Sequence, residues 1–232
     1  METVQNTNEK FVALLEIKES LANAVRRSLI EIPTLAVDEL EIFKNDSALY
    51  DEIIAHRIGL TPLKTEKSMN SKTSIDFKLS KSGPGMVYSE ELEGSGDVVF
   101  GKVPITFLPE GGKIELVATA KVGIGLDHSK HVPGLCYYRH LLEVKSNPQI
   151  DKIVEASKSG LVKSEKKGSS WTCDLSEAEI EEIESIDKDA ISNTDKLIFI
   201  VESYGNMPAK DIFQSAIKAL GDNLKEFEKA VK

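Results

Sequence analysis

The sequence predicts an α+β fold, with helices near both ends of the chain and β-strands between them. Residues 74–80 and 113–122 alternate apolar and polar side chains, which is typical of strands that bury one face. Residues 21–31 and 208–232 place apolar side chains three or four positions apart, which is typical of amphipathic helices. These two periodicities indicate a mixed chain whose middle is rich in strands.

The first predicted elements lie before residue 45. A continuous apolar run over residues 11–17 predicts a strand that is buried on both faces. Ser20 can cap a helix over residues 21–31, and Pro33 ends it. Residues 37–43 predict the next strand.

The middle of the chain begins with a helix and continues as strands. The helix is predicted over residues 48–58, with Gly59 as its C-terminal cap. Alternating strands follow at residues 74–80, 103–107 and 113–122, and a hairpin loop at residues 109–112 precedes the last of them.

The composition changes after about Glu143. We predict a helix over residues 149–159, a polar flexible segment over 163–170, and a solvated acidic helix face over 177–184. Residues 195–203 then predict a short buried strand.

The last helix carries a seam of apolar residues whose spacing is alternately four and three. At 1.5 Å per residue the helix is about 36 Å long, which is longer than a small domain needs. It can pack entirely on its own sheet, or its far half can bind a partner chain. The candidate partner-binding residues are Phe213, Ile217, Leu220, Leu224 and Phe227.

Composition excludes several classes of protein. The chain of 232 residues has a net charge of −9, which disfavours an autonomous DNA-binding protein. No apolar run approaches the roughly 18 residues of a membrane span, and the polar N-terminus does not resemble a signal peptide. Cys136 and Cys173 are the only cysteines, too few for a zinc or iron–sulfur site, so we expect a cytoplasmic protein without either.

One loop carries side chains with metal-binding chemistry. Asp127, His128, His131 and Cys136 lie within ten residues, and imidazole and thiolate both bind zinc. Hydrogen bonding of these side chains to the surrounding backbone is the alternative. A metal-dependent enzyme that uses this loop is therefore a hypothesis to test.

Two pairs of basic residues are candidates for contacts with other proteins. Arg26 and Arg27 point about 100° apart on the first helix, so one can pair locally while the other meets a partner. His56 and Arg57 on the second helix allow the same interpretation. Both pairs can equally be solvated surface cations.

The stretch from Leu21 to Leu63 resembles the opening of the α-like subunits of multisubunit RNA polymerases. LANAVRRSL, IPT and DEIIAHRIGLTPL follow the family pattern, with Thr61 in place of the usual aliphatic residue. GIGLDHSKHVP resembles a motif of the archaeal and eukaryotic members, although Ser129 and His131 depart from it. LIFIVESYGNMPAKDIFQSAIKAL resembles the closing strand and dimerisation helix.

The archaeal branch, the D subunits, is the most similar. The chain ends with the helix, without the DNA-binding domain of bacterial α subunits, and it lacks the cysteine-rich loop of nuclear members. Many archaeal members carry a ferredoxin-like insert that binds an iron–sulfur cluster. The corresponding region here has only Cys173, so the resemblance implies a remnant insert without a cluster.

The resemblance implies a discontinuous architecture. Residues 1–45 and 191–232 are expected to form a dimerisation domain, residues 46–146 a β-rich insert domain, and residues 147–190 the ferredoxin-like remnant. It implies a heterodimer with the small L subunit, formed through the apolar seam of the last helix. Arg26, Arg27, His56 and Arg57 are expected to contact the large catalytic subunits, and small subunits N and P to dock nearby.

The functional alternatives make different predictions. A non-catalytic scaffold subunit of DNA-directed RNA polymerase has no activity of its own and makes no sequence-specific DNA contact. A metal-dependent enzyme holds stoichiometric metal at His128 and its neighbours. A bacterial-type α subunit forms a homodimer without the L subunit.

Overall fold

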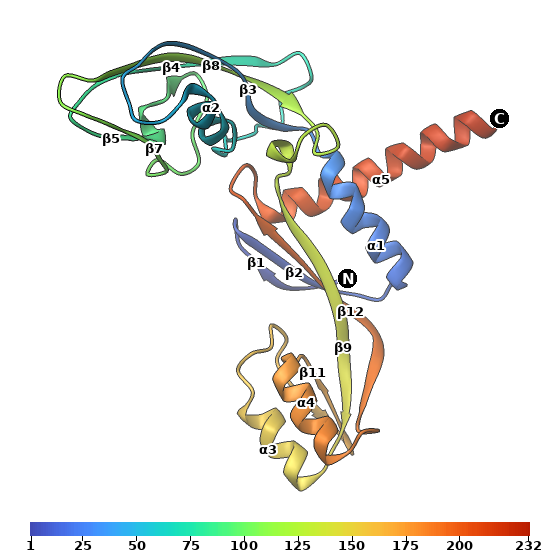
Figure 1. Cartoon of the computed structure of the whole chain (residues 1–232). Coiled ribbons are helices and arrows are strands. Elements are labelled where there is room, and N and C mark those ends of the chain that lie inside the picture. The colour runs from blue at the N-terminus through green and yellow to red at the C-terminus, as the bar shows by residue number, and fades with distance from the viewer.

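The computed structural model describes residues 1–232 and confirms the α+β prediction. The molecule is elongated and has three parts (Figure 1). We call them the central unit, with the strands at residues 2–15, 134–145 and 191–203 and the helices at residues 19–28 and 209–231; the β-rich unit, residues 34–123; and the insert, residues 147–190. None of the helices combines the length and apolar character required to cross a membrane.

The central unit is built on three antiparallel strands. β2 (Lys10–Leu15) pairs with β12 (Ile191–Ser203), and β12 pairs with β9 (Gly134–Lys145). The polar strand β1 (Glu2–Asn6), whose five residues are all exposed, forms one edge. β12 has thirteen residues, longer than the predicted strand over 195–203.

Two helices cover one face of this sheet. α1 (Glu19–Ser28) continues as a 3-10 turn, η1 (Leu29–Glu31), and packs against α5 (Ala209–Val231). The predicted Ser20 cap is wrong, because α1 begins at Glu19, two residues earlier than predicted, and its N-cap, Lys18, makes no side-chain capping bond.

The core under the helices follows from the alternation of the buried strands. The Phe11 ring centroid lies 5.2 Å from that of Phe213, and the Phe199 centroid lies 5.3 Å from it. On strand β2, Val12 and Leu14 point to the opposite face of the sheet, where they pack with Ile198 and Ile200. Both faces of the central strands are therefore buried.

The β-rich unit contains a four-stranded sheet in the order β3-β8-β4-β6, a two-stranded sheet of β5 and β7, and helix α2. Helix α2 packs on β3 and β7. The elements are β3 (Thr34–Asn45), α2 (Asp51–Gly59), β4 (Ser74–Ser82), β5 (Gly85–Tyr88), η2 (Ser89–Glu91), β6 (Glu93–Gly94), β7 (Pro104–Leu108) and β8 (Lys113–Gly123).

The insert is a small layer of two helices on a hairpin. It comprises α3 (Pro148–Ala156), β10 (Glu165–Lys167), β11 (Ser170–Cys173) and α4 (Glu177–Ile186). β11 pairs with the end of β9, so the insert continues the six-stranded sheet. The segment over 163–170 that was expected to be polar and flexible thus contains the first strand and the turn of the hairpin.

Two strands pair within a different unit from the one in which they were expected. β3, expected within the dimerisation segment 1–45, pairs with β8 in the β-rich unit. β9, expected within the segment 46–146, pairs with β12 in the central unit. Both strands have twelve residues. The chain enters the β-rich unit at residue 34, where β3 begins, and returns to the central unit between residues 123 and 134, where β9 begins.

Candidate partner-binding surfaces

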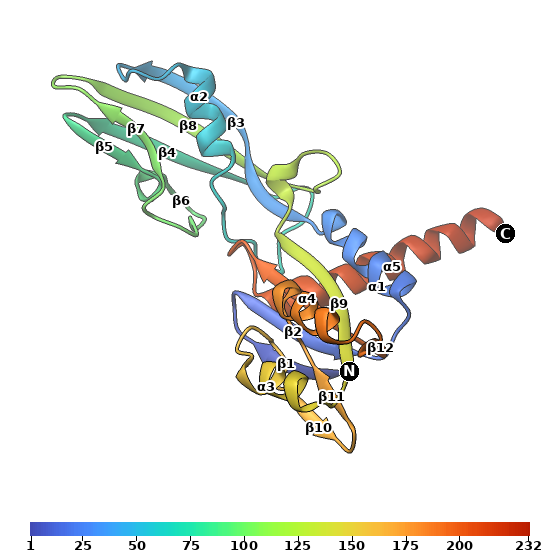
Figure 2. The ribbon, with the colours of Figure 1, turned by 60° about the horizontal axis from the view of Figure 1, so that its bottom comes forward.

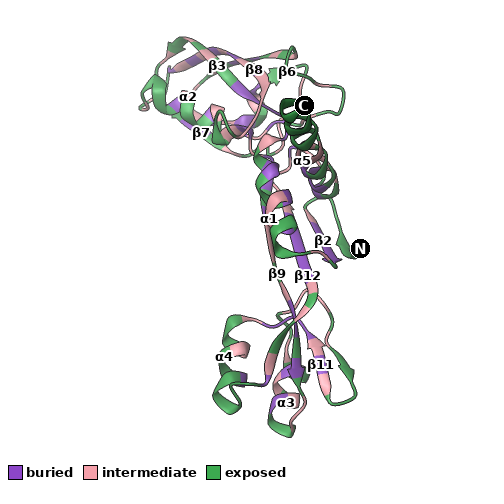
Figure 3. Cartoon of the chain, turned by 90° about the vertical axis from the view of Figure 1, so that its right-hand side faces the viewer, coloured by how far each residue is buried: buried purple, intermediate pink, exposed green.

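Helix α5 divides into a buried half and an exposed half. Phe213 is 6% exposed in the core of this chain, and Leu220 packs partly against the same core. Further along, the exposed fractions are 46% for Ile217, 60% for Leu224 and 68% for Phe227. The far half of the helix extends away from the sheet, and nearly all of it is exposed (Figure 3).

The exposed half receives little support from the rest of the chain. The side-chain amide of Asn223 bonds to Glu31, and the later polar contacts lie within the helix, as between Lys225 and Asp222 at 2.9 Å. Of the predicted seam, Ile217, Leu224 and Phe227 are therefore exposed to solvent, while Phe213 is buried in the chain's own core. We name these three exposed residues the α5 stripe.

The first basic pair lies at the end of α1. Both arginines are exposed, and they occupy the last helical turn, where a positive charge interacts favourably with the helix dipole. Arg26 bonds to the side-chain oxygen of Asn23 through two nitrogens, at 3.1 and 2.9 Å. Arg27 is exposed on the same turn. Arg26 is therefore paired locally while Arg27 remains available to a partner, which is one of the arrangements considered from the sequence.

The second basic pair lies on α2 in the β-rich unit. Arg57 donates to the carbonyl oxygen of Ile105 at 2.9 Å and so fastens α2 to β7. His56 is exposed and lines a groove with Val37 of β3 and His128. The structure therefore places the two basic pairs in different units and does not bring them together into one patch.

The structure does not support the hypothesis of a metal-dependent enzyme, because it does not bring the four residues together into one site. Cys136 lies in the core beneath the helices, and burial raises the pKa of its thiol to about 12. The buried His131 ring bonds through Nδ1 to the carbonyl of Thr34 at 2.8 Å, and burial lowers its pKa. His128 caps η3 (Ser129–His131) by accepting from the Lys130 N–H at 3.1 Å, while Asp127 is exposed. The loop holds its side chains by backbone hydrogen bonds.

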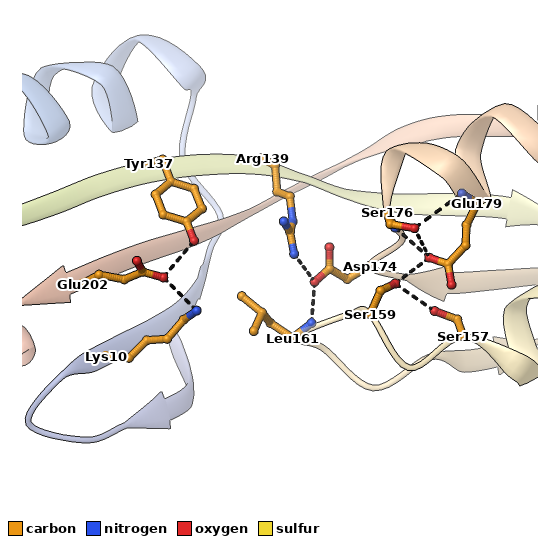
Figure 4. Close-up of polar contacts among 10 residues, drawn as sticks. All are labelled: Lys10, Tyr137, Arg139, Ser157, Ser159, Leu161, Asp174, Ser176, Glu179 and Glu202. Atoms are coloured by element: carbon orange, nitrogen blue, oxygen red, sulfur yellow. Dashed lines mark hydrogen bonds and ion pairs between the residues drawn. The ribbon is translucent and has the colours of Figure 1, made fainter.

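Separate groups of polar contacts lie near the joint between the central unit and the insert, and no sequence motif signals those of Asp174 and Glu202 (Figure 4). Asp174, 1% exposed, accepts from Arg139 and from the Leu161 N–H, both at 2.7 Å. Nearby, Lys10 and the Tyr137 hydroxyl contact Glu202, and the Lys10 hydrogen bond lowers the pKa of that carboxyl. The hydrogen bond from the Leu161 N–H to Asp174 fixes the loop whose Leu161 and Val162 pack on the second face of the sheet.

A second unsignalled residue is Asn206, in the turn between β12 and α5. It is 3% exposed and bonds to the backbone of the β-rich unit on both sides of Lys64. Its only sequence signal is its position directly after ESYG in the predicted closing motif.

Together these features define an α+β protein whose C-terminal helix keeps one apolar stripe uncovered. The RNA polymerase Rpb3/Rpb11 dimerisation domain matches residues 14–224 of the chain, and the chain belongs to this family.

Three relatives illustrate the similarity, and each is a DNA-directed RNA polymerase subunit Rpo3. The one from Pyrococcus horikoshii is 34% identical over 237 residues, covering 94% of this chain and 92% of the relative. The one from Pyrococcus furiosus is 37% identical, covering 91% and 88%. The one from Methanocaldococcus jannaschii is 29% identical, covering 94% and 88%. The relatives are therefore matched over nearly their whole length.

Proposed function

We propose that the chain is a non-catalytic assembly subunit of a DNA-directed RNA polymerase. The observation that carries this proposal is the α5 stripe, on a chain of the Rpb3/Rpb11 dimerisation family. Full burial of a large apolar side chain stabilises a complex by about 1.5–3 kcal/mol, so covering three of them is a substantial driving force. Such a stripe on the surface of a soluble chain is typical of a protein–protein interface.

The partner that fits the stripe is a small subunit with the same kind of dimerisation fold, the L or Rpb11-like subunit. An amphipathic helix presents anchors at positions i, i+7 and i+10 to an apolar groove or to a second helix. Ile217, Leu224 and Phe227 have that spacing. In this arrangement the heterodimer forms first and the large catalytic subunits are added to it.

The large subunits are proposed to bind the exposed basic pairs on α1 and α2, with small subunits N and P nearby. The net charge of −9 supports a subunit that makes no sequence-specific DNA contact of its own. We place the assembled complex in the cytoplasm.

A cluster-free insert is part of the same proposal. An iron–sulfur cluster takes four cysteine ligands, and the two cysteines here lie in separate cores, Cys136 in the central unit and Cys173 in the insert. Burial raises the pKa of each thiol to about 12, so the ligating thiolate is disfavoured at both. The donor set does not fit a cluster, and the insert is proposed to be a ferredoxin-like remnant.

Affinity purification of the tagged chain from the cells that produce it tests the proposal. We expect stoichiometric recovery of one small dimerisation-family chain and two very large subunits, identified by mass spectrometry. Recovery of the chain as a homodimer, or alone, contradicts the proposal.

A further inference from the structure

The covalent connections between the central unit and the β-rich unit meet at one point. The chain enters the β-rich unit at Thr34 and leaves it at Gly123, and these two residues are paired in the β3–β8 ladder. The ring of His131 packs there, bonded to Thr34, so closely that a Cβ on Gly123 would lie 2.5 Å from its Nε2. Two crossings side by side do not by themselves fix the angle between the units, so contacts elsewhere, such as the 3.0 Å ion pair between Lys67 and Asp211 of α5, have to do so.

A second contact between the units lies in the turn from β12 to α5. The Asn206 side-chain amide donates to the carbonyl oxygen of Leu63 at 2.9 Å, and the backbone carbonyl of Asn206 accepts from the Thr65 N–H at 2.9 Å. Leu63 is fully buried in the core of the β-rich unit. Figure 2 shows this turn and the segment that descends from the β-rich unit meeting each other.

Both sides of this contact are built for a close approach. Gly205 has φ +98°, a conformation that favours glycine, and a Cβ there would lie 2.3 Å from Cγ1 of Val99. Ser203 holds the turn, because its hydroxyl accepts from the Gly205 N–H at 2.9 Å. On the other side, the Thr65 hydroxyl accepts from the Leu35 N–H at 3.0 Å.

We propose that Asn206 is a positioning residue that fixes the orientation of the β-rich unit relative to α5. This inference rests on the proposed function, in which α5 binds the small partner and α2 of the β-rich unit receives a large subunit. A platform with two docking surfaces binds a third protein more tightly when the surfaces are already oriented, because less freedom is lost on binding.

The chemistry of the contact favours an amide at this position. Asn206 pairs a buried donor with the Leu63 carbonyl, and a buried carbonyl without a donor is costly. Alanine removes the donor and leaves that oxygen unpaired. Aspartate keeps the shape but turns a second oxygen toward it. If the role is only local packing, both variants lower stability without changing the orientation of the units.

A distance measurement between the units separates these roles. Spin labels on Asn6→Cys in the central unit and Lys78→Cys in the β-rich unit, both exposed positions, report the distance in the full chain bound to its small partner. Both native cysteines are buried. We expect a narrow distribution in the otherwise unchanged chain and a distribution at least twice as wide in Asn206→Ala.

The matched control is Thr194→Ala. Thr194 donates to the carbonyl of Leu141 at 2.7 Å, a side-chain-to-backbone bond of the same kind, but one that lies within the central unit. This control is expected to leave the distribution narrow. An unchanged distribution in Asn206→Ala, or equal broadening in the control, overturns the proposal.

An assembly measurement completes the test. Asn206→Ala is expected to bind the small partner within twofold of the unchanged chain and to recruit the large subunits at least tenfold less. If the unchanged chain recruits no large subunits, the proposed function fails while the distance measurement still tests the joint. If Asn206→Ala does not fold, Asn206→Asp, which keeps the shape of the side chain but replaces the donor to the Leu63 carbonyl, carries the same distance measurement: a broadened distribution supports the proposal and an unchanged one overturns it.

Discussion

Arg139 and Asp174 join strand β9 to the residue that follows β11 through a 2.7 Å hydrogen-bonded ion pair. The carboxylate is almost completely buried, whereas the arginine side chain is 41% exposed. The same carboxylate oxygen also accepts from the Leu161 N–H, and the other oxygen, Oδ1, has no partner. Asp174 thus fastens the loop whose Leu161 and Val162 cover the sheet.

Replacing Asp174 by alanine is expected to lower the free energy of unfolding by about 2–3 kcal/mol, because it removes two hydrogen bonds that involve a charged group and uncovers the sheet. Urea unfolding measures the change. Glu165→Ala is the control, since Glu165 pairs with Lys167 at 3.9 Å on the surface and is worth less than about 1 kcal/mol. Equal effects of the two substitutions contradict the assigned role of Asp174.

Leu224→Asp is expected to weaken binding of the small partner at least a hundredfold while leaving the stability of the free chain nearly unchanged. Leu224 is exposed in the free chain, but the proposed complex would bury an unpaired carboxylate there. Titration calorimetry and urea unfolding separate the two effects. Gln214→Glu adds the same charge at an exposed position outside the α5 stripe, and a comparable loss of binding there would refute the assignment.

Replacing Arg26 and Arg27 together by alanine is expected to spare the small partner and to weaken recruitment of the large subunits. Both side chains are exposed, so the stability cost is limited to the loss of the Asn23 bonds and the helix-dipole interaction, about 1 kcal/mol. Reconstitution with purified subunits measures recruitment. Normal assembly by the double variant would mean that these arginines are surface cations.

Acid is expected to destabilise the insert between about pH 4 and pH 2. Hydrogen bonds from Lys166 and Trp171 lower the pKa of Asp151 from 3.8 to about 2. Because the folded-state pKa lies below the unfolded one, this stabilisation is complete above about pH 4 and disappears as pH falls to about 2.

Trp171 is the only tryptophan, and its indole N–H donates to Asp151 at 2.7 Å, so its fluorescence follows the acid transition. In Asp151→Asn, which keeps an acceptor oxygen, the transition is expected to be shallower. An identical acid profile in this variant would show that Asp151 does not contribute.

Several elements with a strong apolar period were predicted from the sequence, whereas the polar strands β1 and β10 and the long central strand β9 were missed. β2 buries a continuous run of apolar residues, and the paired strands β4 and β8 bury alternate ones, so the local sequence is sufficient to predict each as a strand. β1 has no buried residue, and β10 is entirely charged and exposed. Such edge strands are held by pairing with a neighbour, a tertiary effect that local sequence does not encode.

The candidate surfaces show the same limit. Spacing alone gives Phe213 and Leu224 equivalent positions on the apolar seam, but only the packed sheet decides that the first is covered by Phe11 and Phe199. Asn206 and Asp174 act through backbone groups far along the chain, at Leu63 and Leu161. No local pattern marks residues whose partners are defined only after folding.

The strands β9 and β12 pair from the junction with the β-rich unit to the insert, interrupted by an irregularity between Asn193 and Leu197. Their ends contribute Val144 and Ile191 to the core of the insert, while their other halves lie in the core of the central unit. The insert is therefore joined to the central unit by a continuous sheet and not by a flexible linker. We expect it to melt together with the central sheet, so that the chain unfolds as two cooperative blocks although it has three visible lobes.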